Sequence, residues 1–128
     1  MSLGDSLSVY AQGLLIQSRR AEVLASNLAN ADTPGYKARD IDFRAALEDA
    51  LDSSNAQARP SHPRHLPIGD KPGSEMLYRV PTQPSLDGNT VESQVEQSVF
   101  AENAVRYQAS LRFLDGALKT MLTAVRGD

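Results

Sequence analysis

The 128-residue chain contains no cysteine and no tryptophan, and aromatic residues make up only 5% of the sequence. The absence of cysteine excludes a disulfide framework, a thiolate zinc site and a cysteine nucleophile. Although 41% of the residues are hydrophobic, many of these are alanine, so the sequence offers little material for a thick globular core. The length is that of one ordinary domain.

Long apolar runs and an excess of basic charge are also absent. No stretch reaches the roughly 20 apolar residues that a helix needs to cross a bilayer. The first residues lack the basic leader, the unbroken apolar run and the small-residue cleavage site of a secretory signal, so we expect no cleaved signal peptide. The net charge of -3 disfavours nucleic acid as the main partner, because phosphate-binding surfaces are usually strongly basic.

Motifs of catalysis are missing as well. The glycines between residues 69 and 73 have the wrong spacing for a phosphate-binding loop, and no nucleophile elbow is present. His62 and His65 lie in a proline-rich stretch without a helix to fix their geometry, so we interpret them as loop residues and not as metal ligands. Helix capping explains Asp42 and solvation explains Asp40, which disfavours an acid–base pair. The sequence predicts no enzyme, no cofactor and no metal site.

The N-terminal region, residues 2–30, has the periodicity of a long helix. Its apolar positions advance by alternating steps of four and three, with Gln17 as the one polar interruption: Leu3, Leu7, Tyr10, Leu14, Gln17, Ala21, Leu24 and Leu28. This spacing is typical of a heptad seam. A second stripe lies roughly 100° around the helix: Val9, Ile16 and Val23. Because one partner helix cannot cover both stripes, we expect this helix to be buried on more than one side. Arg19 and Arg20 are expected on an exposed face.

The C-terminal region, from Asn89 to Arg126, repeats the pattern. Its seam contains Phe100, Ala104, Tyr107, Leu111, Leu114, Leu118, Met121 and Val125. Asn89 followed by Glu92 predicts a capping box at the start of the helix, and Gly127 predicts its end. A basic stripe with a seven-residue spacing predicts a face that is solvated or bound to an acidic neighbour: Arg112, Lys119 and Arg126.

The middle of the chain predicts a turn, a short helix and an extended segment. The sequence Thr33-Pro34-Gly35 favours a type II turn, after which Tyr36 is placed to pack back on the first helix. Asp42 is expected to cap a short helix lined by Phe43, Ala46, Leu47, Ala50 and Leu51. Six of the seven prolines lie between residues 52 and 88, and we expect this segment to be extended or mobile.

Together these patterns predict an all-α fold. The two terminal helices form a coiled-coil-like pair, about 40 and 50 Å long, with the short helix and the proline-rich segment between them. The expected organisation is residues 1–31 as one axial helix, 32–88 as the connection and 89–128 as the second axial helix, in one structural domain formed by both termini. Such a pair leaves apolar flanks that other copies or other proteins must cover, so the sequence is typical of an assembly subunit.

Two stretches stand out from this background. Residues 27–40 read NLANADTPGYKARD, and residues 78–92 read YRVPTQPSLDGNTVE. The first resembles the N-terminal signature of flagellar axial proteins, the family of rod and hook subunits. The second, together with AENAVRYQASLRFLD at 101–115, extends the resemblance over nearly the whole chain. The chain has no room for the added domains of hook and distal-rod members. Leu28 and Val105 stand where isoleucine and leucine are expected more often.

The resemblance implies a structural subunit of the proximal rod of the bacterial flagellar basal body, in the periplasmic space. Such a subunit would assemble with itself and with other proteins through its terminal helices and transmit torque from the membrane ring rotor. The implied partners are copies of itself, other rod proteins, the adaptor between rod and membrane ring, and the flagellar type III export apparatus. The stretch 27–36 would lie between neighbouring subunits.

The residues expected to pack between subunits come from the two seams and from the turn. They are Leu3, Leu7, Tyr10, Leu14, Leu24, Asn27, Leu28, Asn30, Thr33, Pro34, Gly35, Tyr36, Phe100, Tyr107, Leu111, Leu114, Leu118 and Met121.

Two other functions remain open from the residues alone. A small helical-bundle enzyme would need Arg or Glu inside the seams, and Gln17 is the only polar residue that the periodicity places there. A helical adaptor that never polymerises would share every helical feature, so that only its oligomeric behaviour would distinguish it from a rod subunit.

Overall fold

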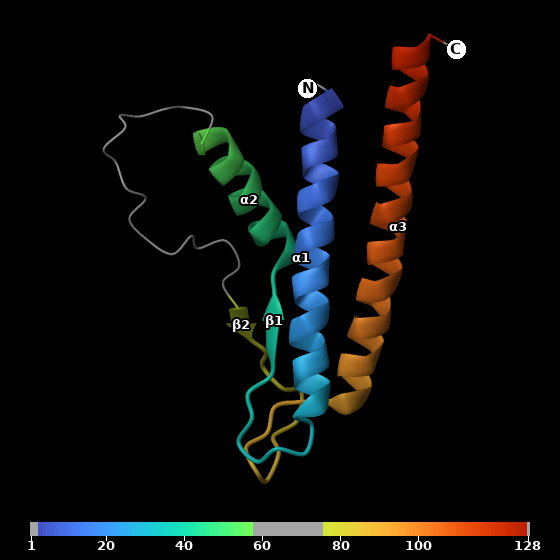
Figure 1. Cartoon of the computed structure of the whole chain (residues 1–128). Helices are drawn as coiled ribbons and strands as arrows, with labels where there is room; N and C mark the ends of the chain where they lie inside the picture. Colours follow the sequence, from blue (N-terminus) through green and yellow to red (C-terminus); the bar gives the residue numbers. More distant parts are fainter. Residues whose placement is uncertain (1–2, 58–75, 128) are drawn as a thin grey trace.

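The computed structural model describes residues 3–57 and 76–127, and this part of the chain is mainly helical. The elements, in order, are α1 (Leu3–Ala29), β1 (Arg39–Ile41), α2 (Phe43–Gln57), β2 (Met76–Tyr78) and α3 (Ser93–Arg126). Helix α1 is central, with α3 antiparallel to it on one side and α2 on the other (Figure 1). The predicted all-α class and the pairing of the two long terminal helices are confirmed.

Helix α1 is covered on two sides, as its two apolar stripes predict. The second stripe meets the short helix and β1: Ile16 forms a buried cluster with Ile41 and Ala46, and Val23 packs against it. A Cβ built at Gly13 would lie 3.7 Å from Cζ of Phe43, an ordinary van der Waals contact, so this ring packs directly against α1. On this side, α1 is therefore buried by residues of the same chain and needs no partner subunit.

Helix α3 is rotated relative to the predicted seam. The residues that it buries against α1 are Glu96 and Asn103, seven positions apart, and not the large apolar side chains. Leu114 and Met121 are half-buried, whereas Phe100, Ala104, Tyr107, Leu111, Leu118 and Val125 are exposed. The predicted α3 seam therefore faces α1 only in part. Buried polar groups need partners, and the need to pair Glu96 and Asn103 fixes the rotation of the helix.

A two-stranded antiparallel sheet lies in the connection and was not predicted. Arg39 pairs with Tyr78, Asp40 with Leu77 and Ile41 with Met76. Strands of three residues are too short to show a two-residue period in the sequence.

Helix α2 extends further than predicted. It continues to Gln57, so the expectation of extended or mobile chain is wrong for residues 52–57. The rest of the proline-rich segment up to residue 75, with His62 and His65, lies outside the described residues.

The predicted cap of α2 and the predicted end of α3 are both confirmed. Oδ1 of Asp42 accepts hydrogen bonds from the N–H groups of Arg44 and Ala45, at 3.1 and 3.3 Å, at the start of α2. Gly127 ends α3 in the left-handed region, with φ of 73°, and its N–H donates to the carbonyl of Thr123.

The predicted capping box of α3 is wrong. The helix begins at Ser93, and its cap residue Glu92 makes no side-chain capping bond. The Glu92 carboxylate instead accepts hydrogen bonds from the N–H and the hydroxyl of Thr82, at 2.7 and 2.6 Å.

Over the described residues, no helix combines the length and the hydropathy needed to cross a membrane.

Candidate functional site

The two stretches that stand out in the sequence dock against each other at the end of α1. The segment 30–38, which follows α1, lies beside the segment 79–90, which leads into α3. Three backbone hydrogen bonds join them: Gly35 N–H to the carbonyl of Asp87, Thr90 N–H to that of Tyr36, and Arg79 N–H to that of Ala38, each 2.9 Å long. We call this contact the junction. It fixes both ends of the connection against the helix pair.

Asn89 is the buried centre of the junction. Its Nδ2 lies 3.0, 3.0 and 2.7 Å from the carbonyl oxygens of Asn30, Ala31 and Thr33, and its Oδ1 accepts from the N–H of Val91 at 2.7 Å. The amide thus draws together three carbonyl groups of the turn that follows α1. Asn89 therefore holds this turn from a distance of about sixty positions in the chain, where its predicted role was to start α3.

The turn after α1 has the predicted geometry. Gly35 has φ of 73°, and Tyr36 N–H donates to the carbonyl of Thr33 at 3.3 Å. This is the geometry of a type II turn with Pro34 in the second position and Gly35 in the third. The Tyr36 hydroxyl reaches back to Oδ1 of Asn27 at 3.4 Å, which confirms that this ring packs against the first helix. The tip of the turn, residues 32–35, remains exposed.

A balanced network of charges lies beneath the junction. Glu96 on α3 is fully buried; it accepts hydrogen bonds from Nη1 of Arg79 and, at 3.2 Å, from Nδ2 of Asn27. Nη2 of Arg79 donates to Asp40 at 2.8 Å. Arg20 on α1 holds the same carboxylate through two bonds of 2.8 and 3.0 Å. Two carboxylates and two guanidinium groups thus link α1, β1, the segment after β2, and α3.

The network corrects three expectations. Arg20 is not on an exposed face, Asp40 is not simply solvated, and a glutamate does lie between the terminal helices. Of the two arginines expected on an exposed face, Arg19 is exposed as predicted. These partners are far apart in the sequence, so no spacing rule connects them. One signal was available: Glu96 lies seven residues before Asn103, and together they mark a polar stripe on α3.

The charges of the network are paired with one another, which indicates a structural role. Burial alone would raise the pKa of Asp40, but the hydrogen bonds from Arg20 and Arg79 outweigh it and hold the pKa below its ordinary value. Every charge in the network has an opposite partner, so no free acid, base or nucleophile is available there for catalysis. In the described part of the chain, no group of His, Asp and Glu side chains could hold a metal ion.

The residues predicted to pack between subunits fall into three groups. Leu24 and Asn27 are buried within the chain; Leu7, Tyr10, Leu14, Leu28, Asn30, Tyr36, Leu114 and Met121 are half-buried; Thr33, Pro34, Gly35, Phe100, Tyr107, Leu111 and Leu118 are exposed. The side chain of Leu3 lies outside the described residues. The polar groups of Asn27 are all engaged inside the chain, with Arg39, Tyr36 and Glu96.

A row of exposed apolar side chains runs along one flank of α3. We call Phe100, Tyr107, Leu111 and Leu118 the α3 strip; their side chains are 37%, 38%, 48% and 44% exposed. Single exposed apolar residues are common on monomeric proteins, but a contiguous row of this length marks an interaction surface. The strip is available because α3 turns its polar stripe toward α1.

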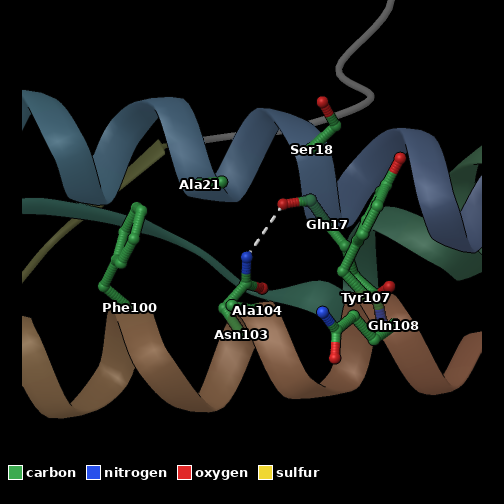
Figure 2. A pocket seen from close by; sticks show the side chains of 8 residues that line it. All are labelled: Gln17, Ser18, Ala21, Phe100, Asn103, Ala104, Tyr107 and Gln108. Carbon is green, nitrogen blue, oxygen red and sulfur yellow. Dashed lines mark hydrogen bonds between the residues drawn. The ribbon is translucent and has the colours of Figure 1, made fainter.

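A groove of about 320 Å³ lies between α1 and α3 beside the strip (Figure 2). Phe100 and Tyr107 stand on its α3 side, and Asn103 lies at its base. Nδ2 of Asn103 donates to the backbone carbonyl of Gln17 at 3.0 Å. The side-chain oxygens of Gln17 and Asn103 are buried and have no hydrogen-bond partner. The sequence showed Gln17 as an interruption of the seam but gave no sign of this groove.

Comparison with known proteins identifies the family. A family model described as flagella basal body rod protein matches residues 7–37, which include most of α1 and the turn. The flagellar basal body rod protein FlgB of Cereibacter sphaeroides is 50% identical over 125 residues, covering 97% of this chain and 96% of that protein. FlgB of Proteus mirabilis (strain HI4320) is 44% identical over 133 residues, covering 97% and 96%. FlgB of Escherichia coli (strain K12) is 41% identical over 131 residues, covering 97% and 95%. The chain therefore belongs to the FlgB family of flagellar basal body rod proteins.

Proposed function

We propose that the chain builds the proximal part of the flagellar rod, by association with copies of itself and with other rod proteins through α1 and α3. Its family makes it a structural protein of the flagellar basal body and not an enzyme. The adaptor to the membrane ring and the type III export apparatus are further proposed partners, and export is proposed to proceed without a cleaved signal peptide.

The observation that carries this proposal is the exposed α3 strip. Leu111 and Leu118 leave 48% and 44% of their side chains in water on a folded chain whose α1 is already covered on two sides. Burying apolar area releases about 25 cal/mol per Å², so contact with a neighbour that covers the strip is favourable. The surface that needs a companion thus lies on α3, and not on the second stripe of α1.

The proposed mechanical role is the transmission of torque. Helices of 27 and 34 residues are about 40 and 51 Å long, so side-by-side contacts along them distribute shear over many side chains. The junction and the charge network tie the connection to both helices, which lets one chain turn as a rigid body. A helical adaptor that never polymerises is the alternative, and its α3 strip would bind a partner without repeating.

The test replaces two strip residues in cells whose own copy of the gene is deleted. Leu111→Gln combined with Leu118→Gln should leave folding nearly unchanged, because both residues are about half exposed, but should prevent recovery of the chain in purified basal bodies and abolish swimming. Leu86→Gln is the matched control, since Leu86 is a fully exposed leucine outside the helices, and it should swim normally. Normal swimming by the double variant would contradict the proposal. Absence of the unmodified chain from basal bodies would favour the adaptor.

A further inference from the structure

Helices α2 and α3 lie on opposite sides of α1, and both run toward the same end of the molecule (Figure 1). The ring of Phe43 in α2 lies against Gly13 in α1. The ring of Phe113 in α3 stacks on Tyr10, one turn earlier in α1, with 6.4 Å between the ring centroids. The two helices are thus at the same level along α1. A second copy beside the first, in the same orientation, would bring α2 of one copy against α3 of the other.

The outward face of α2 is acidic. Asp49 and Asp52 are exposed there, and neither has an ion-pair partner within the described residues. Glu48 is also exposed but is paired with Arg44, so the two aspartates set the sign of this face. The inward face packs on the first helix and β1 through apolar side chains: Phe43, Ala46, Leu47 and Ala50.

The outward face of α3 is basic and hollowed. It carries the basic stripe, whose three side chains are all exposed. Arg112 follows the buried Asn103 by nine positions, which places it about 180° around the helix, away from α1. Lys119 has Asp115 beside it at 2.7 Å, so the stripe keeps an excess of positive charge. An apolar hollow of about 420 Å³ lies beside the stripe and is lined by Val105, Gln108, Ala109, Arg112 and Phe113.

We propose that the outward face of α2 in one copy docks on the outward face of α3 in a second copy, with Asp49 and Asp52 opposite Arg112 and Lys119. The inference rests on the proposed function and names a contact by which copies would meet side by side. Helix α2 has 15 residues and is about 22 Å long, which matches the length of α3 from Val105 to Lys119.

The two parts of this contact act differently. Opposite charges across a contact select the partner face and fix the alignment more than they add affinity. Apolar burial comes from Val105, which is 66% exposed in the single chain and would be covered by the neighbouring α2. The α3 strip stays free for a further neighbour, because Leu118 and Lys119 are one position, and hence about 100°, apart on the helix.

The geometry also determines how the contact would propagate. It joins two different surfaces that point away from α1 in opposite directions. Such a contact repeats from copy to copy, giving rings or helical assemblies instead of a two-fold dimer.

Cysteine cross-linking tests the contact, because the chain has no cysteine of its own. Ala45 on α2 and Ala109 on α3 are exposed on the two faces. A chain with both Ala45→Cys and Ala109→Cys replaces the unmodified copy in cells, basal bodies are purified, and a short bismaleimide is added. We expect a ladder of dimers, trimers and longer products, because α1 separates the two positions within one chain. Either single variant should remain monomeric. Dimers from a single variant, or incorporation of the double variant without a ladder, would overturn the inference.

An exchange of charges tests whether the two faces recognise each other. Arg112→Glu with Lys119→Glu should lower incorporation into basal bodies at least tenfold, because two acidic faces would then meet. Adding Asp49→Arg and Asp52→Arg to the same chain should restore incorporation, because the charges are exchanged across the contact. Circular dichroism of the purified chains should show equal helix content.

The control restores the net charge without restoring the contact. It combines Arg112→Glu and Lys119→Glu with Glu22→Lys and Glu102→Lys, which lie on α1 and α3, and it should not recover. Equal recovery of the control, or no recovery of the exchanged chain, would contradict the pairing of α2 with α3. Normal incorporation of the first variant would refute this contact and leave the rod assignment intact. Failure of the unmodified chain to enter basal bodies would refute both.

Discussion

Asn27 on α1 donates a hydrogen bond to Glu96 on α3 at 3.2 Å, and both side chains are completely buried. The two residues are 69 positions apart in the sequence, so the bond fixes the two terminal helices relative to each other. A buried carboxylate is tolerated only when it is paired, and Asn27 and Arg79 supply the donors. This pairing turns the polar stripe of α3 inward and leaves the α3 strip on the surface.

Removing the charge of Glu96 should destabilise the chain strongly. Glu96→Gln removes one of the two carboxylates that pair with Arg79, leaving Asp40, and places an amide N–H₂ where two donors already converge, so we expect a loss of about 3 kcal/mol in the free energy of unfolding. Urea denaturation followed by circular dichroism measures it. The control is Glu102→Gln, which breaks the exposed pair with Arg106 on the same helix and should cost at most about 0.5 kcal/mol. Equal effects of the two substitutions would mean that the buried network is not what holds the helices together.

The stability of the chain should fall in acid partly through Asp40. Because the folded-state pKa of Asp40 lies below its ordinary value of 3.8, the unfolded chain binds this proton more readily. The stabilisation by Asp40 is therefore complete above pH 3.8 and is lost as the pH falls from there through the folded-state pKa. Unfolding free energies of the wild type and of Asp40→Asn, measured over a pH series, should converge as the pH decreases below this value.

Asp49→Asn is the control for this titration, since Asp49 is an exposed carboxylate on α2 outside the network. Because this carboxylate is exposed, the substitution should change the free energy of unfolding at neutral pH by at most about 0.5 kcal/mol. Some acid sensitivity will persist in Asp40→Asn, because hydrogen bonds from Ser85 to Asp87 and from Thr82 to Glu92 also lower the pKa values of those carboxyls. A constant difference between the wild type and Asp40→Asn across the series would show that the two arginines do not favour the charged form.

The same substitution should have opposite signs at two glycines. Gly35 adopts φ of 73° in the turn, so Gly35→Ala should destabilise by about 1–2 kcal/mol although no atom lies within 4 Å of the added Cβ. Gly116 lies in the middle of α3 with open space around it, so Gly116→Ala should stabilise by about 0.5–1 kcal/mol through helix propensity. Thermal unfolding of the two variants measures both. Two shifts of the same sign would contradict the assigned backbone geometry.

Hydrogen exchange on dilute protein should reveal a gradient along α3. The helix continues beyond the beginning of α1 at its C-terminal end, where Leu122 and Val125 are 53% and 80% exposed (Figure 1). We expect the amides of residues 122–126 to exchange fastest within α3 and those around Ile16 and Leu24 in α1 to exchange slowest, since these side chains are buried on the two sides of α1. Uniform protection along α3 in the dilute chain would contradict this order.

Much of the fold could be predicted from local patterns. The two long helices follow from their apolar spacing, the turn from Pro34 and Gly35, the start of α2 from Asp42, and the end of α3 from Gly127. Each of these depends on residues that are neighbours in the chain, so the physical cause lies within a few positions. The extension of α2 to Gln57 and the short β1–β2 pair were missed, because neither segment has a periodicity strong enough to identify it.

The surfaces that carry the proposed function depended on contacts that no local pattern contains. The sequence by itself determined that two amphipathic helices would form and would together have more apolar surface than they could cover, because the spacing of side chains on a helix is fixed by its geometry. Only the tertiary structure decided which of that surface stays free. Glu96, Asn103 and Asn89 each have a hydrogen-bond partner within the first 33 residues, and these contacts with distant residues set the rotation of α3.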